Sequence, residues 1–316
     1  MATVTTPDVR LSSLPPAVGQ AGLRGAIASE FTKLRSVRST YWTLGALFVV
    51  SVGLGVLICA GTAANLVNNP GNKAGFDATQ NSLGAFFELG QLIIAVIGAM
   101  VITSEYSTGM VRTSLTAQPR RGVVYAAKAI SFTTVTLVIS LVTAFVAFFV
   151  GQTVYSGKGV AASLFHTVTI PASANVNCTG GGPGAGPGNC VATFSGTDVI
   201  TASTVLTAII GTALFVTIVA LISFGVGSIV RHTAGAIAIV IALMFIVPIL
   251  EHTLPDNWHN DIMRFLPDAA NQVVSLTIAS DGPGHLWSAW PQLGVTALWA
   301  VVLVGIGAYL FRKRDA

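Results

Sequence analysis

Six long apolar runs, separated by polar segments, constrain this 316-residue chain more than any other feature. A helix needs about 20 mostly apolar residues to cross a bilayer. Open sheet edges are not tolerated in lipid, and the runs do not alternate as barrel strands do. Charged residues make up only 9% of the chain, against about 25% in an average soluble domain. We therefore predict an all-α polytopic membrane protein with six transmembrane helices, at about residues 41–61, 83–103, 129–150, 204–230, 234–250 and 295–311.

The distribution of Lys and Arg residues predicts the orientation of the chain. Loops rich in these residues stay in the cytoplasm, because cations resist translocation. Thirteen of the sixteen lie on one set of alternate connections, and three lie on the other set. Both termini are therefore predicted to be cytoplasmic. The thirteen are Arg10, Arg24, Lys33, Arg35, Arg38, Arg112, Arg120, Arg121, Lys128, Arg231, Arg312, Lys313 and Arg314; the three are Lys73, Lys158 and Arg264.

The segments outside the six runs divide into tails and a surface helix. Residues 1–22 lack the apolar region of a signal peptide and are predicted to form a disordered cytoplasmic tail, and residues 312–316 a basic cytoplasmic tail. Within residues 23–40, apolar residues recur every three to four positions, which predicts an amphipathic helix along the membrane surface. Glu30 lies within this stripe, where it can pair with Lys33 one turn later. The charged residues of this interfacial helix are Glu30, Lys33, Arg35 and Arg38.

The polar segment 104–128 is the longest predicted cytoplasmic connection between two runs. Glu105 follows the end of the second run, and Gly109 is a predicted helix break. A Pro-Arg-Arg-Gly turn at 119–122 comes before the third run. The pattern predicts a helix–turn–helix excursion that is long enough to present a docking surface.

Two motifs in these segments resemble a known family. Glu105 is followed by Tyr-Ser-Thr-Gly-Met-Val-Arg, and the lead-in Ser29–Trp42 has the sequence SEFTKLRSVRSTYW. Both resemble the ABC-2 type transporter permeases, especially the actinobacterial ones. The six runs, the cytoplasmic termini and the short connection between the fourth and fifth runs agree with that family. The loop at 151–199 is longer than expected for it.

The resemblance implies a function and a set of partners. It implies the membrane permease subunit of an ATP-driven ABC exporter in the bacterial plasma membrane, paired with a second permease copy or paralogue. The helix around 25–39 would be the family's connecting helix. The segment 105–121 would be its coupling helix, which inserts into a separate ABC ATPase subunit. The residues assigned to this coupling are Glu105, Gly109, Arg112, Arg120 and Arg121.

The chain shows no nucleotide site of its own. No G-x-x-x-x-G-K-[ST] motif occurs, and Gly157-Lys158 is not followed by Ser or Thr. We therefore expect no enzymatic activity and no cofactor on this chain, with ATP and Mg bound by the partner ATPase. The net charge of +4 is not a nucleic-acid signal, because the basic residues sit beside apolar segments, where anionic lipid headgroups attract them.

Three further groups of residues are candidates. Glu88 and Gln91 lie one turn apart in the outer part of the second run, where a charge indicates a pathway or gating role; a carboxylate at the outer interface is the alternative. Cys178 and Cys190, in the extracytoplasmic loop 151–199, form either a disulfide, which we favour, or two free thiols. The His, Asp and Glu residues at 251–261 have no spacing that fits a compact metal site, so no metal is expected.

Two other functions remain open from the sequence. An ion-coupled secondary transporter would need paired ionisable residues at mid-bilayer and often shows inverted repeats, whereas only Glu88 lies inside a run and no repeat is visible. A non-transporting membrane anchor or sensor would leave the segment 104–128 without a binding partner.

Overall fold

The computed structural model of the chain describes most of its helical part. The described residues are 22–36, 38–69, 76, 78–159, 168–171, 174–178, 190–194, 197–200, 202–247, 265–267 and 289–313. The predicted N-terminal tail therefore lies almost wholly outside the described residues, and so do the His, Asp and Glu residues at 251–261.

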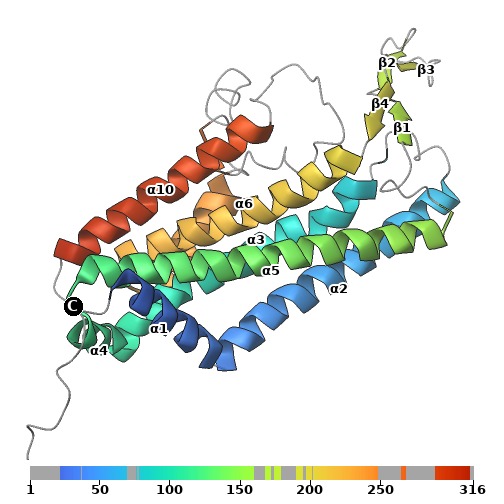
Figure 1. The fold of residues 1–316 in the computed structure, drawn as a ribbon. Coiled ribbons are helices and arrows are strands. Elements are labelled where there is room, and N and C mark those ends of the chain that lie inside the picture. Colours follow the sequence, from blue (N-terminus) through green and yellow to red (C-terminus); the bar gives the residue numbers. More distant parts are fainter. Residues whose placement is uncertain are drawn as a thin grey trace, which may run out of the picture.

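Long helices form a bundle in which they run roughly side by side (Figure 1). Each continues past its predicted apolar run, because polar residues extend the helix beyond the lipid-facing stretch. The elements are α1 (Leu23–Ser36), α2 (Arg38–Asn68), α3 (Ala78–Thr108), α4 (Met110–Ala117), α5 (Arg121–Gly157), α6 (Ala202–Val230), α7 (Thr233–Ile241), the π-helix η3 (Ala242–Ile246) and α10 (Ala289–Lys313).

Among the described residues, five helices are long and apolar enough to cross a membrane, and they belong to α2, α3, α5, α6 and α10. The helical membrane region agrees with the predicted fold class, but the predicted count of six is not confirmed. The fifth predicted run corresponds to a shorter apolar helix, Thr233–Ile246, and residues 248–250 lie outside the described part. The short connection expected between the fourth and fifth runs is present, because α6 ends at Val230 and α7 begins at Thr233.

The centre of the bundle is formed by α3 and α6. In their most apolar stretches, 61% and 67% of the residues are buried, against 22% for both α2 and α10. Small residues let the two central helices approach closely: a Cβ atom on Gly98 would lie 2.6 Å from the carbonyl oxygen of Ala220. Ser223 donates a hydrogen bond across this contact to the carbonyl of Ala95. The outer helices α2 and α10 instead present large apolar side chains on the outside of the bundle.

Two short antiparallel ribbons lie between residues 168 and 200, at one end of the bundle (Figure 1). The sequence did not predict them, because the argument against strands applies only within lipid. The register places Cys178 opposite Cys190. Residues directly opposite in an antiparallel ladder have Cα atoms about 4.5–5.5 Å apart, which lies within the span of a disulfide. The bridge itself stays a prediction. The strands are β1 (Val168–Pro171) with β4 (Thr197–Ile200), and β2 (Ala174–Cys178) with β3 (Cys190–Phe194).

Candidate functional site

The predicted docking segment lies at the bundle end opposite the strands, which we call the α4 end. It comprises α1, the end of α3, α4, the start of α5 and the end of α10 (Figure 1). Sequence-distant elements thus meet here. The short helix α4 packs against α3 and α5.

Gly109 separates α3 from α4. Its φ of 71° and ψ of 6° place it in the left-handed region, where a residue with a Cβ atom costs roughly 1–2 kcal/mol. The helix break predicted from the sequence is therefore present. The glycine N–H donates to the carbonyl of Tyr106 at 3.3 Å, and the break between the two helices is confined to this single residue. On α4, Val111 is buried while Arg112 is exposed.

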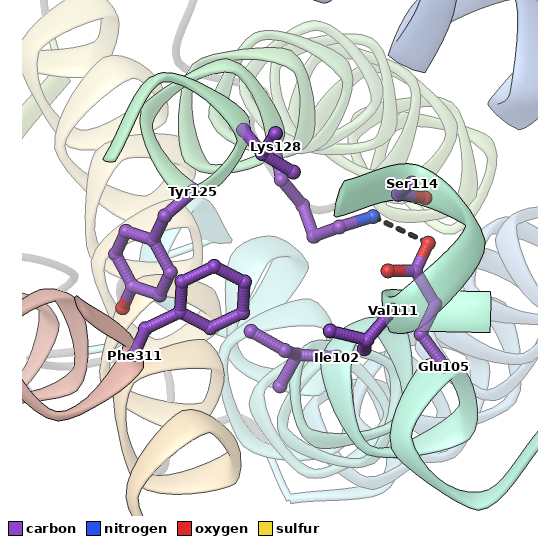
Figure 2. A pocket seen from close by; sticks show the side chains of 8 residues that line it. Ile102, Glu105, Val111, Ser114, Tyr125, Lys128 and Phe311 are labelled. Carbon is purple, nitrogen blue, oxygen red and sulfur yellow. Dashed lines mark hydrogen bonds and ion pairs between the residues drawn. The ribbon is translucent and has the colours of Figure 1, made fainter. Parts of the chain in front are cut away.

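Four charged side chains form a connected network behind α4. The Lys128 ammonium on α5 donates to Glu30 on α1 and to Glu105 on α3, each at 2.7 Å. The Lys33 ammonium donates to Glu30 at 2.6 Å and to the Ser114 hydroxyl on α4 at 3.1 Å. Figure 2 shows the Lys128 side chain reaching from α5 toward the Glu105 carboxylate. The network therefore joins α1, α3, α4 and α5.

Because this network is largely buried, its ion pairs matter for the stability of the fold. Glu30 and Lys128 are only 5% and 7% exposed. Removing one partner of a buried ion pair typically costs about 3–5 kcal/mol, because the remaining charge is left uncompensated. Burial itself opposes ionisation of Glu30. The charges and hydrogen bonds of Lys128, and then of Lys33, outweigh this effect and lower the pKa of the Glu30 carboxyl.

Aromatic and hydroxyl contacts tie further elements to the α4 end. The Arg231 guanidinium lies 4.8 Å from the centre of the Tyr106 ring. The Thr233 hydroxyl donates to that of Thr103 at 2.9 Å. The Tyr125 hydroxyl donates to the Val304 carbonyl at 3.1 Å. The turn between α6 and α7, and the helix α10, are therefore fastened to the same end as α4.

A cavity of about 10 Å³ lies between α4 and this packing, which is roughly the space of one water molecule. Lys128 and Glu105 lie on one side of it, and the rings of Tyr125 and Phe311 lie on the other (Figure 2). The cavity is too small for a transported molecule. The α4 end is thus built as a set of linked helices rather than as a small-molecule site.

The sequence of nearly the whole described bundle matches a known protein family. The profile of the family described as "ABC-2 family transporter protein" matches residues 26–316, which include all of the described helices except the first three residues of α1. The chain belongs to the ABC-2 transporter family. A comparison with curated proteins gives no significant match. Membership supports a permease role for this multi-pass membrane protein, in a family whose members are typically non-catalytic membrane subunits that partner an ABC ATPase.

In this ABC-2 protein, the predicted site residues fall into separate groups. Glu30, Lys33 and Glu105 come together in the network, and Glu30 pairs with Lys33 as the helical spacing suggested. Arg35 and Arg112 are exposed and have no contact in the network. Arg120 and Arg121 line a separate groove, and the side chain of Arg38 is outside the described part.

The Glu105 carboxylate pairs with Lys128 of α5, while Arg112, on the same polar segment as Glu105, is exposed. Lys128 was treated only as a marker of orientation. Its signal was available: two carboxylates and one lysine all lie at the same predicted membrane boundary.

The second candidate pair of the ABC-2 protein is also separated. Glu88 is exposed on α3, while Gln91 is buried and only 2% exposed. The Gln91 side-chain oxygen has no hydrogen-bond partner among the described residues. Leu92 and Met100, one and three turns after Glu88, are exposed at 39% and 43%. Glu88 therefore belongs to an exposed stripe on an otherwise buried helix.

Proposed function

We propose that the chain is the permease subunit of an ATP-driven exporter in the bacterial plasma membrane, and that α4 inserts into a separate ABC ATPase subunit. The observation that carries the proposal is the α4 end itself: a short helix that follows the break at Gly109, is hydrogen-bonded to α1 through Ser114, and lies beside buried ion pairs that join α1, α3 and α5. The Lys and Arg distribution supports placing this end in the cytoplasm. ATP and Mg would then be bound on the partner.

Several exposed side chains of α4 suit a protein contact. Arg112 and Thr113 are exposed, and so is Met110 at 46%. The opposite face carries Val111, which packs in the core and is only 4% exposed. A partner bound to the exposed face would transmit its movement to α4, because the other face of α4 is packed into the bundle.

The ion-pair network can transmit a movement of α4 to neighbouring helices. A displacement of α4 acts on Ser114 and therefore on Lys33, and a displacement of the end of α3 acts on Glu105 and therefore on Lys128. Both lysines bind the same carboxylate, Glu30. We infer that α1, α4 and the start of α5 move as one body when the ATPase changes shape.

The exposed stripe on α3 supports a second permease copy and a pathway. A carboxylate within a span is costly in lipid and almost always faces the bundle interior or a water-filled cavity. In the isolated chain, Glu88 is exposed on the surface of the bundle. We infer that the stripe with Glu88 faces the transport pathway, which a second permease copy closes.

The test is recovery of an ABC ATPase from native membranes. Arg112→Glu reverses the charge of an exposed residue on α4 and should abolish co-purification of an ATPase identified by mass spectrometry. The matched control is Arg24→Glu, which makes the same change at an exposed position of α1. The control should retain the partner. Equal recovery with both variants, or no ATPase with the wild-type chain, would overturn the proposal.

A further inference from the structure

A second basic feature of the α4 end lies outside the ion-pair network. An open groove of about 400 Å³ is lined by residues of α1, α5 and α10 and by Arg120, which directly precedes α5. Three of its seven lining residues are arginines, and none is acidic. The lining residues are Leu23, Arg120, Arg121, Gly122, Val123, Ala126 and Arg312.

The Arg312 guanidinium lies close to Gly122. A Cβ atom at residue 122 would lie 2.5 Å from a terminal nitrogen of the Arg312 guanidinium. Arg312 therefore lies directly over the backbone of the first turn of α5, where a Cβ atom would displace its guanidinium. The end of α10 thus brings a third arginine to the Arg120–Arg121 pair.

The surface lining the groove is almost wholly apolar, and the arginine side chains beside it suit a phosphate group. A guanidinium presents a planar fork of N–H donors that matches phosphate oxygens in bidentate fashion. The α5 N-terminus adds partial positive charge, and phosphates bind readily at such ends. Basic pockets between transmembrane helices bind anionic lipid headgroups.

The rest of the groove fits the remainder of a lipid. Leu23, Val123 and Ala126 give it an apolar wall. Beyond it, α10 and α5 expose apolar side chains to the bundle exterior, among them Ile306 at 44% and Ile130 at 44%. An acyl chain attached to a phosphate in the groove can continue along this surface, whereas a free anion would leave it uncovered.

We propose that Arg120, Arg121 and Arg312 bind the headgroup phosphate of an anionic phospholipid. The lipid bridges α1, α5 and α10 at the membrane boundary. Arg120 and Arg121 then act as lipid ligands rather than as contacts for an ATPase. The proposal requires a membrane protein with this fold, and it holds whether or not α4 binds an ATPase.

The test is native mass spectrometry of the detergent-solubilised protein titrated with phosphatidylglycerol or with phosphatidylcholine. The wild-type chain should retain phosphatidylglycerol in preference to phosphatidylcholine. Arg312→Gln should weaken phosphatidylglycerol binding about tenfold, as expected for loss of a charge-assisted hydrogen bond. Arg35→Gln removes the same charge from an exposed position of α1 outside the groove and should bind as the wild type does.

A second variant separates geometry from charge. Gly122→Ala keeps all three arginines but displaces the Arg312 guanidinium, and it should also weaken phosphatidylglycerol binding. Ala is a better helix former than Gly, so misfolding is not expected to explain the loss. Equal weakening by Arg35→Gln and Arg312→Gln would overturn the proposal. So would displacement of the lipid by inorganic phosphate at equal concentration, because the acyl chain would then contribute nothing.

Discussion

The α4 end and the middle of the bundle are held together by different forces. In the middle, α3 and α6 meet through small residues, with Gly98 against the Ala220 backbone. At the α4 end, α1, α3, α4 and α5 meet through buried charges centred on Lys128. Close packing fixes one spacing between helices, because protein interiors are dense and deform little. The ion pairs at the α4 end instead join side chains from helices that are far apart in the sequence.

The largest expected effect comes from removing the charge at the centre of the α4 end. Lys128→Met should destabilise the protein by about 3–5 kcal/mol, because Glu105 and Glu30 each lose a buried partner. The measurement is the thermal unfolding midpoint in detergent. Lys33→Met is the matched control, since its side chain is 35% exposed and such a pair contributes about 1 kcal/mol or less. Equal effects of the two variants would show that burial does not set the strength of this network.

The next largest effect tests the packing of the middle. Gly98→Ala places a methyl group against the Ala220 carbonyl and Ser223, and overpacking of this kind costs about 1–3 kcal/mol. Gly45→Ala on α2 meets no atom within 4 Å and should leave the unfolding midpoint unchanged or raise it. A Gly98→Ala midpoint equal to the wild type would mean that the two helices can move apart freely.

Substitution at the α3–α4 joint should have a smaller effect on stability and a distinct effect on coupling. Gly109→Leu should cost about 1–2 kcal/mol, because Leu resists a positive φ. It should also reduce substrate-stimulated ATP hydrolysis by the partner in lipid. Asn tolerates this conformation, so Gly109→Asn should retain most of both properties. Loss of hydrolysis with Asn as well would assign the role to the space around residue 109 rather than to its backbone.

Local patterns predicted much of this molecule and long-range ones did not. Apolar runs predicted the helical membrane region, and single residues predicted the break at Gly109 and the turn before Thr233. The network around Lys128 escaped prediction because its partners, Glu30 and Glu105, lie 98 and 23 positions away. No periodicity connects such residues. Only the packing of α1 and α3 against α5 brings them together.

The packing of distant helices also separates the predicted coupling residues from one another. One polar segment of the sequence contains Arg112, Arg120 and Arg121, so the sequence alone does not distinguish their roles. The structure places Arg112 on the exposed face of α4 and the other two in the groove beside Arg312. The turn between α4 and α5 separates them, and its consequence depends on where α10 ends, almost 200 positions later in the chain.

The smallest expected effect is the dependence of the α4 end on pH. Burial and two lysines act on Glu30 with a net lowering of its pKa from the ordinary value of 4.5. The ionised form is therefore favoured in the folded state. Below about pH 5 the unfolded state binds protons first, so stability falls as the pH is lowered through the folded pKa, and it is fully present above 4.5.

Glu30→Gln isolates this contribution. The variant should be less stable than the wild type at neutral pH, because Lys128 and Lys33 lose a charged partner. Its unfolding midpoint should decline less steeply between about pH 5 and pH 3, since no proton can be taken up at residue 30. The slope is the informative quantity, because a general loss of packing lowers the midpoint at every pH alike. Parallel profiles for the two proteins would show that Glu30 is not preferentially ionised in the fold, and the α4 end would then depend on packing as the middle of the bundle does.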